Sequence, residues 1–476
     1  MVNIWAGSGL TRGWAKALVA LLAATALLAA LAWSVGAFPY KIDLSLTASK
    51  RSAFPEMKVN AGGGYVAVVW AEGVNSASDY GKIRLKRSKL SNGLWVERKP
   101  VFDPATSSGY GQSPRLAFGS VVTTAHVVWL WGSSSTPTEI RYSKCNIASS
   151  AACDPAGGEI IDSTTSPGSI VQPAVTVDGN GVPHAVWVKN GVLRYGYRVG
   201  ANNWHIDTRF WSNSVAPAIA YAKNGSNNYL HLAYVLSTTK QINYIRGSIS
   251  GGATTWQDAS QEGFSRGSLV DSGSPSIAAA GPDVILAWDA GIEIKPSNSQ
   301  YAVAYNRSAN AGDDWELSGA AWRLVPSGGY AIVDSVKRTS DETSSYYIRR
   351  LQPDVTLEIT TTAPYTVVHI VWHEKVQSEE ATFRHDVLYS SASFGDLVGG
   401  CSDCWLAPTN VTSATKESWS AANSASGAVA VGRGQIHTAY MEEVGSDWDV
   451  FYNGDLDAAN ATGVHFPIIT RKKIRR

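Results

Sequence analysis

The 476-residue sequence predicts an all-β protein, a seven-bladed β-propeller that follows an N-terminal hydrophobic helix. One observation behind this is composition: 44 Gly, 18 Trp and 20 Tyr with only 3 Met suit tight turns and half-buried pleated surfaces. A hydrophobic content of 44% argues against a disordered chain, and 17% charged residues argue against a coiled coil or helical array. The other observation is a strand pattern that recurs seven times, with a mean period of about 62 residues.

Residues 1–37 form the first predicted element, a signal peptide or membrane anchor. Arg12 and Lys16 precede an apolar run from Ala17 to Trp33, and small residues follow up to Ala37. This pattern fits signal-peptidase cleavage after Ala37, but the apolar run is also long enough to begin to span a bilayer. With either outcome, we expect a secreted or membrane-anchored protein whose propeller is extracytoplasmic.

Residues 38–54 are predicted to be a linker that includes a ring-closing strand. Residues 42–46 alternate in hydropathy like a strand and could pair with the last repeat. Residues 464–469 compete for the same edge. Closure by one of the two segments is expected because a propeller buries both faces of every blade only when the ring is complete.

Residues 55–469 contain the seven repeats. In the first six repeats a proline opens a short first strand. In all seven, a second strand ends in Trp or Tyr, and a third strand ends near Tyr-Ser or its equivalent. The opening prolines are Pro55, Pro114, Pro173, Pro217, Pro275 and Pro353, and the seventh repeat has none. The second-strand aromatic residues are Trp70, Trp129, Trp187, Tyr234, Trp288, Trp372 and Tyr440. A solenoid is the alternative, but it favours shorter and more uniform periods.

The four cysteines form two close pairs, Cys145/Cys153 and Cys401/Cys404, in equivalent loops of the second and sixth repeats. In an exported protein we expect both pairs to be disulfides. A redox-active pair or half of a zinc site is the alternative, although no second Cys/His cluster completes a zinc site.

Five histidines each precede a second-strand aromatic residue by three positions, and they are His126, His184, His231, His369 and His437. Equivalent positions indicate a repeated structural role, such as a hydrogen bond between adjacent strands. A metal ring is the alternative, but equivalent positions around a propeller lie too far apart to share one ion. The sequence therefore predicts no metal site and no cofactor.

One repeat carries a finer motif, in which Ser308, Asn310, Gly312 and Trp315 follow the pattern Ser-x-Asp-x-Gly-x-Thr-Trp. Weaker copies lie near Trp95, Trp204 and Trp256. With these motifs the chain resembles the sialidase-like propellers that carry Asp-box (bacterial neuraminidase) repeats. The resemblance implies a tight turn in which the Asp or Asn caps the backbone, Gly takes a positive φ and Trp packs between blades.

For an enzyme, the same resemblance implies three arginines that grip the substrate carboxylate, an acid/base Asp, and a Tyr nucleophile paired with Glu. Of the residues that follow the prolines, only Arg115 is an arginine. The candidate residues for a polar central pocket are Glu56, Glu72, Arg115, Asp354 and Glu374. The alternative is that these are solvated loop charges. The chain's many strand Trp and Tyr residues suggest exposed aromatic groups for a binding protein.

Charge is concentrated at the ends of the chain. Residues 470–476 form a basic tail with five positive charges, and residues 1–37 hold two more. The rest of the chain has the remaining 33 of the 40 basic residues and all 39 acidic ones, so it is mildly acidic. A nucleic-acid ligand is not expected, because the body has no basic face. The tail is either a solvated end or a weak contact with a membrane or cell wall. The sequence favours a binding or scaffold module for a glycan or surface protein, with a sialidase-like glycoside hydrolase as the alternative. It leaves the oligomeric state open.

Overall fold

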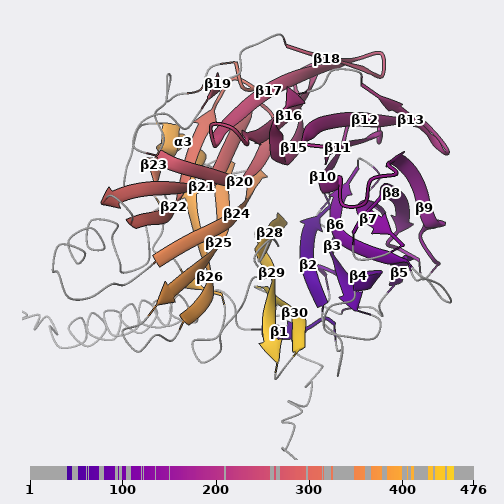
Figure 1. Cartoon of the computed structure of the whole chain (residues 1–476), viewed down its shortest axis with the longest axis horizontal. Coiled ribbons are helices and arrows are strands. Elements are labelled where there is room, and N and C mark those ends of the chain that lie inside the picture. The colour runs from indigo at the N-terminus through magenta and orange to yellow at the C-terminus, as the bar shows by residue number, and fades with distance from the viewer. Residues whose placement is uncertain are drawn as a thin grey trace, which may run out of the picture.

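In its described residues the computed structural model is all-β apart from one short helix, and its strands form seven blades around a centre (Figure 1). The structure describes residues 40–454 except for parts of the connections between strands, the longest being 316–322, 325–347 and 412–426. The signal or anchor of residues 1–37 and the basic tail of residues 470–476 lie outside the described residues. Among the described residues, no helix has the length and hydropathy that a membrane crossing requires.

The first four blades are antiparallel sheets in which the chain runs from the inner strand outward. Blade 1 contains β2 (Ser52–Val59), β3 (Tyr65–Gly73), β4 (Tyr80–Lys89) and β5 (Lys99–Phe102), and blade 2 contains β6 (Tyr110–Phe118), β7 (Thr124–Gly132), β8 (Glu139–Asn146) and β9 (Asp154–Ser163). Blade 3 contains β10 (Ile170–Val177), β11 (Pro183–Lys189), β12 (Val192–Gly200), β13 (Asn203–Ile206) and β14 (Trp211–Ser212). Blade 4 contains β15 (Ser214–Asn224), β16 (Asn227–Leu236), β17 (Gln241–Ser250), β18 (Ala253–Trp256) and β19 (Glu262–Gly263).

Blades 5 and 6 follow the same order. Blade 5 contains β20 (Leu269–Ala280), β21 (Asp283–Lys295), β22 (Asn298–Ser308) and β23 (Arg323–Leu324), and blade 6 contains β24 (Ile348–Ile359), β25 (Thr366–Gln377), β26 (Phe383–Ser393), α3 (Phe394–Val398) and β27 (Thr409–Asn410). A parallel contact between Tyr301 and Arg349 joins the two blades into one extended sheet.

Blade 7 closes the ring with a strand from the other end of the chain. It contains β28 (Gly427–Gly432), β29 (Gln435–Val444) and β30 (Asp447–Gly454), and its outer strand is β1 (Tyr40–Asp43), which pairs antiparallel with β30. Ser45 fastens the strand, because its Oγ donates to Asp449 Oδ1 at 2.8 Å and accepts from the Val450 N–H at 3.0 Å. Of the two segments that the sequence offered for closure, the N-terminal one supplies β1, and residues 464–469 lie outside the described residues.

The seven inner strands β2, β6, β10, β15, β20, β24 and β28 surround the centre in Figure 1. Each contacts the inner strands of both neighbouring blades, and β28 contacts β2, so the ring is closed. The apolar core fills the spaces between successive blades. The predicted seven-bladed propeller is therefore confirmed.

Each of the first six inner strands has a β-bulge at its proline. The proline and the residue before it lie opposite a single residue, the second-strand aromatic of that repeat. The sequence predicted that each of these strands starts at its proline. In the structure the strands start before the proline. Proline suits the bulge because it has no N–H to donate to the ladder. In five of these strands the preceding residue has a positive φ of 49–58°: Phe54, Ser113, Gln172, Ala216 and Gln352.

The five repeated histidines bind a tyrosine of the third strand in the same blade. Their Nδ1 atoms lie 2.6–2.8 Å from the tyrosine hydroxyls in the pairs His126–Tyr142, His184–Tyr195, His231–Tyr244, His369–Tyr389 and His437–Tyr452. All five histidines are buried. This hydrogen bond between adjacent strands is the structural role that their spacing indicated.

A third-strand tyrosine also packs edge-on against a tryptophan of the next blade. We call each contact a Tyr–Trp wedge. The wedges are Tyr142–Trp204, Tyr195–Trp256, Tyr244–Trp315, Tyr305–Trp405 and Tyr452–Trp95, with ring centroids 4.7–5.4 Å apart. Edge-to-face packing of this kind stabilises aromatic pairs beyond their buried area. Four of the five tyrosines, all but Tyr305, are also hydrogen-bonded to a histidine, so one side chain links the core of its own blade to its neighbour.

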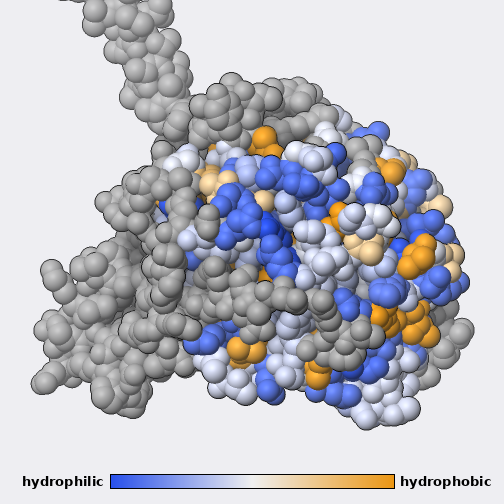
Figure 2. Space-filling view, turned by 90° about the horizontal axis from the view of Figure 1, so that it is seen from above, coloured by the Kyte–Doolittle hydropathy of each residue, from blue (hydrophilic) through white to orange (hydrophobic). Residues whose placement is uncertain are grey.

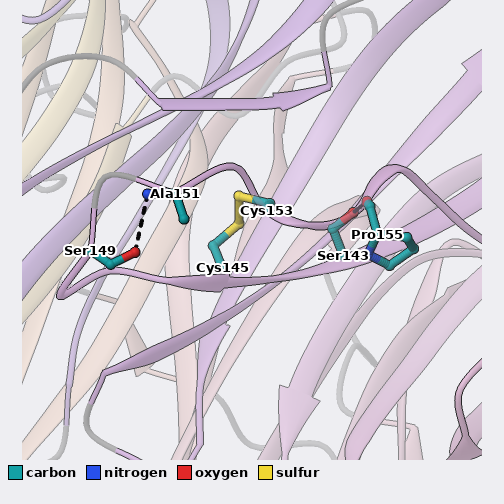
Figure 3. The surroundings of a disulfide bond; sticks show 6 residues. All are labelled: Ser143, Cys145, Ser149, Ala151, Cys153 and Pro155. Carbon is teal, nitrogen blue, oxygen red and sulfur yellow. Dashed lines mark hydrogen bonds between the residues drawn. A yellow bond between two sulfur atoms is a disulfide. The ribbon is translucent and has the colours of Figure 1, made fainter.

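The junction between blades 1 and 2 is built differently. Leu85 of β4 occupies the tyrosine position, and the disulfide Cys145–Cys153 of blade 2 belongs to the same apolar cluster. Figure 3 shows the disulfide joining β8 to the segment that leads into β9, and beside it Ser143 Oγ donates to the Pro155 carbonyl at 2.8 Å. The predicted Cys145–Cys153 bond is confirmed, and the Cys401–Cys404 pair lies outside the described residues.

Candidate functional site

The inner strands bring the residues that follow the prolines to the centre of the ring. These residues are Glu56, Arg115, Ala174, Ala218, Ser276 and Asp354, one from each of the first six blades. Because every bulge lies at the same point of its strand, the six positions are structurally equivalent. Blades 3 and 4 place alanine there, and the other four place polar or charged groups.

Glu56 is the centre of a charged group that connects blades 1, 2 and 3. Its Oε1 lies 2.9 Å from Lys58 Nζ, and its Oε2 lies 3.6 Å from Arg115 Nη1. The Arg115 Nε donates to the Pro173 carbonyl at 3.2 Å. The Lys58 side chain is 34% exposed and the Arg115 side chain is 25% exposed, so neither side chain is fully buried.

Asp354 connects blades 5, 6 and 7 in a similar way. One carboxylate oxygen accepts from Ser276 Oγ at 3.0 Å, and the other accepts from the Val429 N–H at 2.9 Å. Burial raises the pKa of Asp354, although the Lys58 charge opposes this shift. Burial alone would lower the pKa of Lys58, but Glu56 and Asp354 together raise it. We call Glu56, Lys58, Arg115, Ser276 and Asp354 the axial cluster.

The structure brings three of the five predicted pocket residues together and separates Glu72 from them. Glu56 pairs with Val69 on the face toward blade 2, whereas Glu72 shares the opposite face with Trp70. Glu72 is buried there, with Arg84 Nε 3.7 Å from its carboxylate. The backbone of Glu374 lies in β25 opposite Arg350, and its side chain lies outside the described residues.

Lys58 was not among the pocket residues predicted from the sequence, although its position pointed to it. It lies two residues after Glu56 and therefore on the same face of the strand. The equivalent positions in other blades hold Ala117, Thr176, Ala220, Ala278 and Thr356. A lysine at a position where the other repeats have small residues indicates that its charge is stabilised by partners that the other repeats lack.

The expectation of exposed aromatic strand residues is wrong. The five second-strand tryptophans are at most 1% exposed, and the wedge tyrosines Tyr142, Tyr195, Tyr244, Tyr305 and Tyr452 are also buried. They are buried because each fills the space between two blades. Figure 2 shows the side of the ring, where hydrophobic residues form small separate groups among hydrophilic ones.

The turn from Ser308 to Trp315 lies away from the axial cluster, on the outer side of blade 5. Ser308 Oγ donates to Asn310 Oδ1 at 2.7 Å and accepts from the Gly312 N–H at 3.0 Å. Gly312 has φ +80°, and Trp315 forms the wedge against Tyr244. This geometry gives all four residues a place in the contact between blades 4 and 5 and none in the centre.

The axial cluster has two carboxylates and two cations, so its formal charge is zero. The one arginine of the axial cluster, Arg115, already faces Glu56 and the Pro173 carbonyl. Within the described part of the chain, no group of three or more His, Cys, Asp or Glu side chains could hold a metal ion. The cluster can offer hydrogen-bond donors and acceptors to a polar ligand.

Several solved structures are similar in fold. The Trypanosoma rangeli sialidase matches with 8% identity and a TM-score of 0.43, over 87% of this chain and 56% of its own length, so the chain spans little more than half of that protein. An α-L-arabinofuranosidase of Fusarium graminearum in complex with an iminosugar inhibitor matches with 9% identity and a TM-score of 0.42, over 72% of this chain and 91% of its own. No family model and no curated protein matches the sequence. At such identities the likeness concerns the fold and not the chemistry.

Proposed function

We propose that this chain is an exported β-propeller that serves as a binding or scaffold module, with a glycan or a surface protein as its ligand. The buried Cys145–Cys153 disulfide supports a location outside the cytoplasm, where such bonds persist. Contact with a membrane or wall polymer through residues 1–37 or the basic tail is part of the same proposal.

One observation carries the proposal: Arg115 is committed to partners within the protein. A sialidase relies on arginines aimed at the substrate carboxylate, because fixed guanidinium groups hold it while charge develops at the sugar ring. Arg115 instead faces Glu56 at 3.6 Å and donates to Pro173. A cluster whose charges neutralise one another favours an uncharged, hydroxyl-rich ligand over an acidic one.

Binding and turnover of the purified full chain test the proposal. We expect no release of a fluorogenic sialoside and measurable binding to immobilised cell-surface glycans. Lys58→Ala should weaken that binding by about tenfold, or about 1.4 kcal/mol. Arg87→Ala is the matched control, because Arg87 of β4 lies over the Tyr65 ring of β3 and outside the axial cluster. Robust sialoside turnover that disappears in Arg115→Ala would overturn the proposal.

A glycoside hydrolase is the second candidate, and the raised pKa of Asp354 favours it. A carboxyl group whose pKa is raised by burial is suited to act as a general acid toward a leaving-group oxygen. Glu56 would be the second carboxylate of such a site.

Fluorogenic sialosides and arabinofuranosides distinguish this candidate from a binding module. If the chain is a hydrolase, Asp354→Asn should lower kcat by about a hundredfold or more. Asp283→Asn is a suitable control, because burial also raises the pKa of Asp283, which begins β21 and accepts a hydrogen bond from Thr366 outside the axial cluster. Equal rates for both variants would exclude Asp354 as the acid.

A further inference from the structure

The five buried histidines fall into two groups according to one neighbouring position. In every blade with such a histidine, an inner-strand residue pairs with it, and the residue two places further along faces the imidazole. Blades 3 and 6 have a carboxylate there. Asp178 Oδ2 lies 3.6 Å from His184 Nε2, and Glu358 Oε2 lies 3.5 Å from His369 Nε2.

Blades 2, 4 and 7 have no side chain that could bear a charge at this position. The residues are Gly119, Ala222 and Gly432. A proton added to His184 or His369 would meet a negative partner, whereas a proton added to His126, His231 or His437 would be a buried charge. The blades therefore differ in how well they tolerate a proton on the buried histidine.

The surroundings of His231 in blade 4 oppose protonation. Tyr244 of β17 binds its Nδ1 at 2.8 Å, and Arg246 of the same strand lies directly opposite it in the ladder. Tyr229 of its own strand lies nearby, with ring centroids 6.3 Å apart. From β15 the histidine meets Ala220, and the facing β20 of blade 5 presents apolar residues. Arg246 is itself paired with Asp313 of blade 5, and its guanidinium opposes a second positive charge on His231.

His126 of blade 2 has a comparable environment. Tyr142 binds its Nδ1, and Lys144 of β8, whose Nζ lies 3.7 Å from Asp154 Oδ2, is opposite it in the ladder. From blade 3, Arg198 lies over the Tyr142 ring at 5.5 Å and is itself bound by Glu159. Gly119 closes the site from the end of the inner strand.

His437 of blade 7 lies among apolar groups at the closure of the ring. Tyr452 of β30 binds its Nδ1 at 2.6 Å, and Ala430 of β28 pairs with it. On this face blade 1 presents the apolar side chains of Met57 and Val66. The same Tyr452 forms the wedge against Trp95 of blade 1.

The three histidines without a carboxylate neighbour have lowered pKa values. Burial lowers the pKa of His126 to about 4 with help from Arg198 and Lys144, and it lowers the pKa of His437 to about 4. Burial and then Arg246 lower the pKa of His231 to about 3. A lowered pKa in the folded state means that the unfolded chain binds more protons below about pH 6.5, so stability is full above that pH and falls toward pH 4.

We propose that the propeller is sensitive to acid, and that the presence or absence of a carboxylate beside each buried histidine determines which contacts between blades weaken. Protonation acts on the wedge tyrosines that bind these histidines, and it therefore weakens the junctions 2/3, 4/5 and 7/1. Junction 7/1 is the closure of the ring, because β1 completes blade 7. Mild acid therefore opens the ring at junction 7/1. The buried histidines of blades 3 and 6 keep their contacts, because each has a carboxylate beside it.

Thermal unfolding of the full chain at pH 7.5 and pH 5.0 tests this proposal. We expect the Tm of the natural sequence to fall by roughly 5–10 °C on acidification. Ala222→Asp places a carboxylate where blades 3 and 6 have theirs, and it should reduce the fall. Ala222→Asn is the matched control with nearly the same shape and no charge, and it should keep the full fall.

A second variant works in the opposite direction. Asp178→Asn keeps an oxygen that can accept from the Asn180 and Val182 N–H groups but removes the charge beside His184. Its Tm should fall further on acidification than that of the natural sequence. Hydrogen exchange should show β1 and β30 losing protection at pH 5.0 before β11 and β12. Equal acid sensitivity of all four proteins, or loss of protection in β11 first, would overturn the proposal.

Discussion

At the scale of single residues, the wedge tyrosines determine how the blades fit together. Tyr244, for example, binds His231 through its hydroxyl and packs its ring against Trp315 of the next blade. The hydroxyl and the ring thus have separate partners, and a change at either partner affects a blade junction. Tyrosine suits this position because it combines a large apolar ring with a polar end that needs a partner when buried.

Gly312 offers a direct test of how closely this junction is packed. A Cβ at Gly312 would collide with the Tyr244 hydroxyl, and its φ of +80° disfavours any other residue. We expect Gly312→Ala to lower the free energy of unfolding by about 2–4 kcal/mol, measured by urea unfolding.

Gly251→Ala is the matched comparison for this prediction. Gly251 has φ +59° but open space around a Cβ, so it reports the backbone cost alone, about 1 kcal/mol. If the two variants lose the same stability, the close approach of Tyr244 contributes nothing.

At the scale of elements, the junctions are variations on one design. Five use a tyrosine against a tryptophan, and the junction of blades 1 and 2 uses Leu85 with a disulfide. Leucine has no polar end that needs a histidine, and blade 1 accordingly has Ala67 at the histidine position. The histidine and the tyrosine are therefore absent from blade 1 together.

Removal of the disulfide should weaken the blade that contains it. The loop that it closes is short, with a sequence separation of 8, so the chain-entropy model gives a loss of about 2.5 kcal/mol for Cys145→Ala/Cys153→Ala. Urea unfolding measures the loss, and hydrogen exchange should locate it in β8 and β9. A loss spread evenly over all blades would contradict a local role at this junction.

At the scale of the whole molecule, the period of the aromatic residues was enough to predict the propeller and its seven blades. The spacing of the histidines predicted their shared role, because equivalent positions in a ring have equivalent neighbours. The candidate site was predicted only in part. Glu56, Arg115 and Asp354 follow prolines and could be found, whereas Lys58 has no counterpart in other repeats. The separation of Glu72 depends on which face of β3 it occupies, and the bulge, which is visible only in the structure, sets that relation.

A rearranged chain would test how the ring is closed. Tyr40 pairs with Gly454, so a two-residue turn could join β30 directly to β1 in a permutant that begins at Ser52. We expect this permutant to unfold at a temperature close to that of the natural order, because every strand pair is kept. A version without β1 should unfold at a lower temperature. Equal stability of these two versions would show that β1 does not close the ring.

The closing strand also determines how the protein responds to force. Whatever precedes Tyr40 pulls on the propeller through β1, which is held by four residue pairs to β30 and by Ser45. A load on that end therefore reaches the ladder of blade 7 before it reaches any other blade. In a tethered molecule this short strand would be the first mechanical link to yield, and the other six blades would carry tension only after it had separated.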